Sequence, residues 1–260
     1  VLYSFDGDAP ADELGGSVSG AGDVNRDGFS DFMASATGHD ANGAGSGLVR
    51  IWSGADGELL HEFKGASAGE GLGVAVSDLG DVDGDGFADV AMSAFSDGVA
   101  ASGTSASNVQ VYSGKTGALL FRRFGAVAGD WFGLELDAAG DVDLDGTPDL
   151  IAGSYRDAIG GFFSGGAYVL SGRSGQILFA VHGQAAQNYA GWSVAGAGDT
   201  DGDGIAEVIV GTLRNSGVAN APGTAMVYSY VPRGMGIACV GEVNSSGLRA
   251  TLTTTGTTTV

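Results

Sequence analysis

Short apolar segments alternate with polar, glycine-rich segments along most of the 260-residue chain. Several apolar segments alternate apolar and polar side chains with the two-residue period of a half-buried strand, for example LVRIW at residues 48–52 and VQVY at 109–112. Many short strands separated by glycine-rich turns are typical of all-β proteins. The pattern therefore predicts an all-β fold.

The same order of segments recurs four times. Each repeat has a glycine, a short strand, an acidic loop, a second strand, a polar loop of variable length and a third strand. The first three repeats continue with a Ser-Gly-x-x-Gly turn and a fourth strand. The expected second strands are 32–34, 90–92, 150–152 and 208–210; the third are 48–52, 109–112, 167–170 and 225–228; the fourth are 59–63, 119–124 and 177–181. Each repeat is therefore predicted to form four antiparallel strands.

A four-stranded unit of this size cannot bury both of its faces alone, so radial stacking into a β-propeller is expected over residues 1–230. The fourth repeat departs from the pattern near residue 231, where its outer strand should follow. Residues 1–7 (VLYSFDG) match the outer strand at 59–65 (LLHEFKG) and are predicted to complete the last blade. The alternative is a segment of a larger ring, for example of seven blades, in which residues 1–7 finish another blade. Residues 231–260 are predicted to be a linker or the start of a further β domain.

The acidic loops carry the candidate chemistry. They share the pattern D-x-[DN]-x-D-G-x-x-[DE] at residues 23–31, 81–89, 141–149 and 199–207, and their starts lie 58, 60 and 58 residues apart. Calcium prefers six to eight oxygen ligands, which this spacing supplies from side chains at positions one, three, five and nine and from a backbone carbonyl at position seven. A glycine at position six permits the sharp turn. The predicted calcium ligands are Asp23, Asn25, Asp27, Phe29 and Asp31; Asp81, Asp83, Asp85, Phe87 and Asp89; Asp141, Asp143, Asp145, Thr147 and Asp149; and Asp199, Asp201, Asp203, Ile205 and Glu207.

The charge of the chain supports the same interpretation. The chain has 31 acidic and 11 basic residues, for a net charge of −20, and fifteen of the acidic residues lie in the four loops. About four calcium ions would lower the net charge to about −12. Such acidity argues against nucleic acid as a partner, and no apolar stretch is long enough for membrane insertion. No cysteine or histidine ligand set accompanies the loops, so a soft metal is not expected.

With these features in place, the chain resembles the FG-GAP repeats of integrin α-subunit propellers and of bacterial extracellular proteins. The FG step is complete at Phe132-Gly133 and occurs as Leu14-Gly15, Leu72-Gly73 and Ala190-Gly191 in the other repeats, whereas the GAP step is degenerate. The resemblance implies a secreted or cell-surface protein, a mainly structural role for calcium, and a role in adhesion or ligand binding.

Two functions are expected from these features. The first is a non-catalytic adhesion module whose protein or glycan ligand contacts the variable loops at 38–47, 97–107, 156–165 and 214–223. The second is a structural subunit of a filament or surface layer, a homo-oligomer assembled by strand addition. An enzyme is not expected, because no catalytic motif surrounds His39, His61 or His182. Trp131 and Trp192 either pack between blades or stack on sugar, and packing is the expected role.

Overall fold

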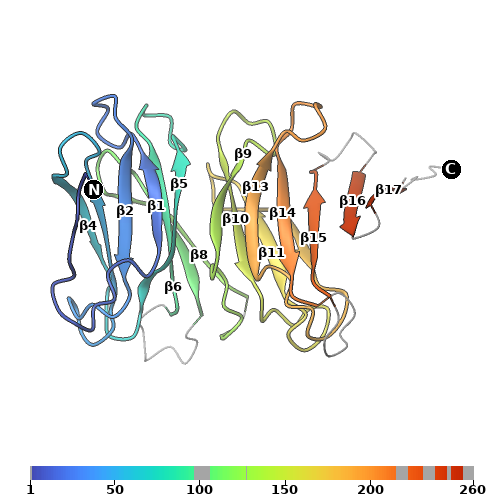
Figure 1. Ribbon diagram of the computed structural model, residues 1–260, viewed down its shortest axis with the longest axis horizontal. Coiled ribbons are helices and arrows are strands. Elements are labelled where there is room, and N and C mark those ends of the chain that lie inside the picture. Colours follow the sequence, from blue (N-terminus) through green and yellow to red (C-terminus); the bar gives the residue numbers. More distant parts are fainter. Residues whose placement is uncertain are drawn as a thin grey trace.

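The computed structural model describes residues 2–96, 106–126, 128–214 and 222–230, together with the backbone of two strands at 238–244 and 247–253. These residues form seventeen strands that pair in antiparallel fashion in four sheets (Figure 1). In this part of the chain there is no helix that could cross a bilayer. The predicted all-β fold is confirmed.

Each repeat forms one sheet whose strands follow chain order. The first two sheets contain β1 (Val18–Gly22), β2 (Asp31–Ala36), β3 (Leu48–Trp52) and β4 (Leu59–Lys64), then β5 (Leu72–Gly80), β6 (Asp89–Ala94), β7 (Asn108–Tyr112) and β8 (Leu119–Phe124). The third contains β9 (Leu136–Gly140), β10 (Asp149–Ser154), β11 (Gly166–Leu170) and β12 (Ile177–His182). The fourth contains β13 (Ser193–Gly198), β14 (Glu207–Thr212), β15 (Thr224–Tyr228), β16 (Ala238–Asn244) and β17 (Gly247–Thr253).

The register of each sheet places one bulge next to each acidic loop. Within each sheet the first strand pairs with the second, and the pairing shifts by one residue where the first strand ends. The last residue of that strand is a glycine with positive φ, namely Gly22, Gly80, Gly140 or Gly198. A bulge with glycine in this conformation bends a strand and ends its pairing. The bulge therefore directs the chain out of the sheet and into the acidic loop.

The core lies between sheets, because successive sheets stack face to face along the chain (Figure 1). Between the first and second sheets, for example, Val49 and Ile51 share a buried cluster with Val90 and Met92. The first strands β1, β5, β9 and β13 contact one another in that order. This stacking buries both faces of the two middle sheets, as expected for four-stranded units that cannot fold alone.

Ring closure by residues 1–7 is not seen in the described part of the chain. Residues 2–7 form no strand and lie against the first sheet, where Phe5 stacks on Trp52 with ring centroids 4.6 Å apart and Tyr3 stacks on Phe32 at 6.0 Å. The edge of β15 pairs instead with β16, which follows it in the chain. The segment is held at the first sheet because its aromatic rings bury apolar surface there.

Candidate metal sites in the acidic loops

The four acidic loops lie at the same end of their sheets, since each joins the first strand of a sheet to the second. In every loop the sixth residue is a glycine with φ between 83° and 90°, and these residues are Gly28, Gly86, Gly146 and Gly204. This left-handed conformation is costly for a residue with a β-carbon, so glycine is required there.

Hydrogen bonds to the backbone hold the carboxylates inward. The two oxygens of the first residue accept N–H groups from within the loop at 2.7 to 3.1 Å, including that of the sixth residue in every loop. The third residue accepts the N–H of the fifth at 3.0 to 3.2 Å, and the fifth accepts that of the seventh at 2.8 to 3.0 Å. The loop thus wraps around the space that its oxygens face.

Three loops bring three carboxylates together, with the ligand atoms within 4.8 Å of one another. The groups are Asp81, Asp83 and Asp85; Asp141, Asp143 and Asp149; and Asp199, Asp201 and Asp203. In the first loop Asn25 takes the third place, and its Nδ2 donates to Asp27 at 2.9 Å. Carboxylates this close repel one another unless a cation or protons offset their charge. The all-oxygen donor set suits a hard cation such as calcium.

In the first three loops the carboxylate of the ninth residue is buried, and both of its oxygens accept backbone N–H groups. Its Oδ2 accepts the N–H of the second loop residue, and its Oδ1 accepts the N–H of the first glycine of the Ser-Gly-x-x-Gly turn. The carboxylates belong to Asp31, Asp89 and Asp149, and the turn glycines are Gly54, Gly114 and Gly172. The ninth carboxylate therefore joins its loop to the hairpin between the third and fourth strands.

The turn glycine is needed because the turn approaches the loop closely. A β-carbon at Gly54, Gly114 or Gly172 would lie 1.8 to 1.9 Å from the carbonyl oxygen of the eighth loop residue. Such a distance is far inside van der Waals contact. Only glycine allows the turn N–H to reach the ninth carboxylate.

The fourth repeat differs from the first three at the ninth loop residue and at the turn glycine. Glu207 replaces aspartate, and Tyr230 stands where the other repeats have the turn glycine. Glu207 Oε2 accepts the N–H of Thr200 at 2.6 Å and its hydroxyl at 2.7 Å. Glu207 Oε1 is buried without a hydrogen-bond partner in the described residues. An unsatisfied buried carboxylate oxygen is costly, and a cation in the loop would satisfy it.

Burial changes the acidity of several loop carboxyls. It raises the pKa of Asp89 and of Asp149 to about 6, against the hydrogen bonds from the turn glycines, which lower it. Burial also raises the pKa of Asp31 and of Asp143. Without a cation these groups resist ionisation, whereas a bound cation would favour their charged form.

Two basic side chains in the turns contact the loops, and the loop pattern alone does not predict them. Lys115 Nζ lies 3.6 Å from an oxygen of Asp85, and Arg173 Nε lies 2.9 Å from an oxygen of Asp145. Both basic residues directly follow the turn glycine, so their place in the repeat could have indicated the contact. Each neutralises part of the charge on a fifth-position aspartate.

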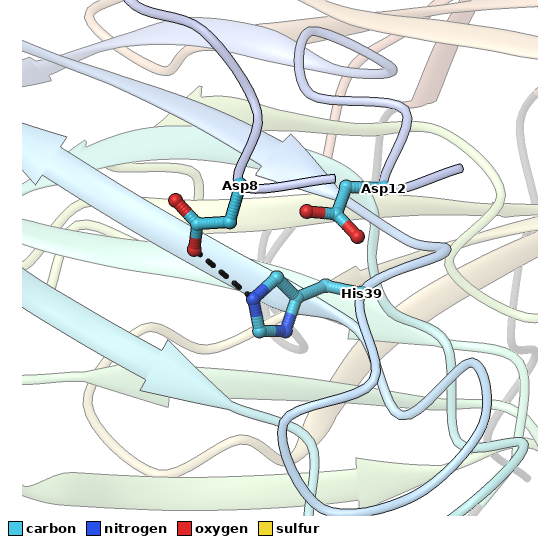
Figure 2. Close-up of side chains that lie close together, drawn as sticks. All are labelled: Asp8, Asp12 and His39. Carbon is cyan, nitrogen blue, oxygen red and sulfur yellow. Dashed lines mark hydrogen bonds and ion pairs between the residues drawn. The ribbon is translucent and has the colours of Figure 1, made fainter. Parts of the chain in front are cut away.

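A fourth group of possible ligand atoms lies outside the repeated loops, at Asp8, Asp12 and His39 (Figure 2). Arg50 already binds Asp8 through two hydrogen bonds of 3.0 and 2.6 Å, and His39 Nε2 lies 3.2 Å from the same carboxylate. The hydrogen bonds from Arg50 lower the pKa of Asp8 to about 2. Because a guanidinium already offsets this charge, the cluster fits a surface ion-pair network better than a metal site.

Of the four variable loops that are predicted to contact a ligand, the structure describes two completely and two in part. The variable loops at 38–47 and 156–165 are described, whereas residues 97–105 and 215–221 lie outside the described residues. Trp131 packs edge-on against Tyr155, but the Trp192 side chain is 42% exposed. Trp192 also packs edge-on against Tyr155 of the preceding repeat, with ring centroids 4.8 Å apart, and Trp131 packs against Phe95 of the second repeat at 5.3 Å. Both tryptophans therefore pack between repeats as expected, and Trp192 in addition keeps part of its surface exposed.

Comparison with known proteins relates the chain to integrin α subunits. It is 31% identical over 172 residues to integrin alpha-5 of Xenopus laevis and 29% identical over 169 residues to integrin alpha-V of Gallus gallus; each match covers 59% of this chain and 16% of the relative. It is 30% identical over 166 residues to integrin alpha-6 of Gallus gallus, covering 61% of this chain and 15% of the relative. The chain thus spans about one sixth of the length of these relatives. No family model matches it.

Among solved structures, similar chains are a rhamnogalacturonan lyase PL11 of Bacillus licheniformis and the rhamnogalacturonan lyases YesW and YesX. Their TM-scores are 0.48, 0.47 and 0.46, with identities of 21%, 20% and 17%. The alignments cover 90%, 90% and 91% of this chain and 49%, 49% and 54% of the others. The prediction that the chain is not an enzyme is contradicted by these neighbours, which are lyases, and is withdrawn. The likeness carries no catalytic activity over to this chain.

Proposed function

We propose that the chain is a calcium-stabilised, integrin-like β-propeller module that binds a ligand outside the cell. The observation that carries this proposal is the repetition of one oxygen-lined loop at the same place in four sheets. The Oε1 atom of Glu207, which is buried and has no hydrogen-bond partner among the described residues, supports a cation in the fourth loop. The similarity to integrin α subunits supports the ligand-binding role.

Calcium in these loops would act mainly on stability. The oxygens of loop positions one, three, five and nine would hold the ion, and the ion would offset their mutual repulsion. At the millimolar calcium concentration outside cells, a site with a Kd near 10⁻⁴ M contributes about 1.4 kcal/mol to the free energy of unfolding. Four such sites would contribute roughly 5–6 kcal/mol, which is comparable with the net stability of a domain.

Thermal unfolding with and without calcium tests this proposal. We expect the melting temperature in millimolar calcium to exceed that in EDTA by roughly 10–20 °C, because the four contributions add. Magnesium at the same concentration is expected to restore much less, because it demands a smaller octahedral shell. Equal melting temperatures in calcium and in EDTA would remove the structural role.

A second candidate function, a subunit of a filament or surface layer, is favoured by the outer face of the first sheet. Beside Tyr3 and Phe5 this face has a hollow of about 730 Å³, and the nearby Val18 side chain is 68% exposed. Sedimentation in calcium tests this function: polymers that disappear on deletion of residues 1–8 would support it, and a monomer at all concentrations would exclude it.

A further inference from the structure

A group of aromatic side chains lies at the end of the sheets opposite the acidic loops. They follow β6 and β10, precede β9 and β13, or belong to the loop between β10 and β11, whereas the acidic loops join the other ends of these strands. We call this group the aromatic strip; its members are Phe95, Trp131, Tyr155, Phe162, Phe163, Tyr189 and Trp192.

The rings of the strip form a continuous chain of contacts. Trp131 and Trp192 both meet Tyr155 edge to face, with ring centroids 5.6 and 4.8 Å apart and interplanar angles of 70° and 73°. Phe95 meets Trp131 in the same way at 5.3 Å. Tyr155 is buried beneath its neighbours, whereas Phe95, Trp192 and Phe162 are 44%, 42% and 63% exposed. The exposed rings are thus joined through less exposed ones into one connected group, and exposed aromatic residues grouped in this way mark an interaction site more often than isolated exposed rings do.

The backbone presents two of these rings at an energetic cost. The residue two positions before the repeat glycine has positive φ in every repeat, with values of 59°, 60°, 59° and 53° at Glu13, Gly71, Trp131 and Tyr189. The second repeat uses glycine, which adopts this conformation without strain. The third and fourth repeats instead carry large aromatic residues, for which it is unfavourable. Strain of this kind tends to persist where function requires the side chain.

Two arginines lie among the rings and pair with no carboxylate in the described part of the chain. The Arg156 guanidinium lies 4.7 Å from the ring centroid of Trp131 and 5.4 Å from that of Phe163. Arg214 lies over Tyr189 at 5.5 Å and donates one hydrogen bond to the amide oxygen of Gln187. Neutral partners leave both positive charges available to a ligand, although the whole chain is strongly acidic.

We propose that the aromatic strip binds an acidic oligosaccharide. A pyranose ring has an apolar face that can stack on the exposed rings of Trp192 and Phe162, while its hydroxyl groups remain in water. A sugar carboxylate would pair with the guanidinium of Arg156, which offers planar donors for two parallel hydrogen bonds. A rigid array of rings favours a stiff, extended ligand, since little conformational freedom is lost on binding. This inference names the ligand class of the module proposed above and rests on that proposal.

Isothermal titration calorimetry in millimolar calcium tests this inference with two matched probes. The probes are cellohexaose and the same hexasaccharide oxidised to the uronate at each C6 position. We expect the uronate to bind at least about tenfold more tightly than cellohexaose, and this preference to shrink with added salt. Arg156→Gln should abolish the preference while retaining weak binding of both probes.

Trp192→Ala and Phe162→Ala should each lower the affinity for both probes by about tenfold or more, because stacking does not depend on the carboxylate. Phe162 is the safer variant, since its side chain is largely exposed and its loss should not disturb folding. Phe124→Ala is the matched control: this ring is 46% exposed on β8, outside the strip, and its loss should leave binding unchanged.

Several outcomes would overturn the inference. It fails if neither hexasaccharide binds, if the strip variants bind like the Phe124→Ala control, or if the two probes bind equally well. It also fails if an aspartate-rich octapeptide binds the strip more tightly than the uronate. Calcium-dependent melting of the same samples separates the two proposals: retained calcium dependence without glycan binding rejects only the ligand class, whereas its absence rejects the module itself.

Discussion

The third and fourth acidic loops have the same length and similar hydrogen bonding but hold their ninth residue differently. Asp149 is fully buried and accepts one backbone N–H on each oxygen, from Val142 and from Gly172. Glu207 is also buried, but both of its hydrogen bonds come from Thr200 and reach one oxygen. Its other oxygen has no partner in the described residues.

The difference separates two roles of the ninth carboxylate. In the first three loops it fastens the loop to the turn between the third and fourth strands, so protein groups alone hold it in place. In the fourth loop Tyr230 replaces the turn glycine, and the longer glutamate turns to Thr200 instead. The fourth loop therefore depends more on a cation, whereas the first three retain part of their structure without one.

The largest effect expected from this comparison is a pH dependence of the calcium-free chain. Burial raises the pKa of Asp89 and Asp149 to about 6, from an ordinary value of 3.8. Between these pH values the folded chain binds more protons than the unfolded chain, so its free energy of unfolding falls as pH rises. We expect a loss of roughly 2–3 kcal/mol per carboxyl between about pH 4 and pH 6, measured by urea unfolding in a chelator.

Calcium should reverse this trend, because it competes with protons for the same carboxylates and binds their ionised form. The double variant Asp89→Asn with Asp149→Asn is the control, and its unfolding free energy in the chelator should fall much less over the same range, because only groups such as Asp31 and Asp143 still have a raised pKa. A wild-type chain whose calcium-free stability rises between about pH 4 and pH 6 would contradict the burial of these two groups.

A smaller effect distinguishes the two loops directly. In calcium-free protein at about pH 5, Asp149→Asn should cost roughly 1–3 kcal/mol, because its amide N–H₂ must face a buried N–H donor. Glu207→Gln should be nearly neutral there, because its carbonyl oxygen can keep both bonds from Thr200. In calcium each variant should lose one bound ion. Equal destabilisation of the two calcium-free variants would show that both ninth residues play the same structural part.

The smallest effect concerns the first loop, where Asn25 replaces the aspartate of the other three. Asn25→Asp adds a carboxylate, and we expect about a tenfold lower Kd for calcium at this loop. Terbium luminescence, excited through nearby aromatic residues, can follow the competition with calcium. In a chelator the same variant should be less stable than wild type, because the added charge repels Asp23 and Asp27. Tighter binding without a calcium-free cost would contradict this electrostatic argument.

Most strands could be predicted from the sequence because each repeat contains the same local pattern. The two-residue period and the glycine-rich turns place β3, β7 and β11 within a residue of their observed bounds. The position of residues 2–7 is not predictable in the same way. Their match to residues 59–65 predicts an outer strand. The stacking of Phe5 on Trp52 instead depends on the face of the first sheet that no other sheet covers, which the local sequence does not reveal.

The loops could also be predicted, since ligand spacing is a property of the local sequence. The sequence predicts the turn glycine only as part of a turn, because its bond to the ninth carboxylate joins residues 23 to 25 positions apart. Once that bond is known, the paired changes at Glu207 and Tyr230 can be understood from the sequence. The sequence does not predict the aromatic strip as a group, because its rings come from different repeats and meet only in the folded chain.

Calorimetric titration of calcium into the stripped chain tests the central claim most directly. The proposal predicts about four ions bound per wild-type chain and one fewer for Glu207→Gln, with the remaining affinities unchanged. Equal numbers of bound calcium ions in the wild type and in Glu207→Gln would contradict the assignment of Glu207 to a site. The absence of binding at millimolar calcium would contradict the account of all four loops.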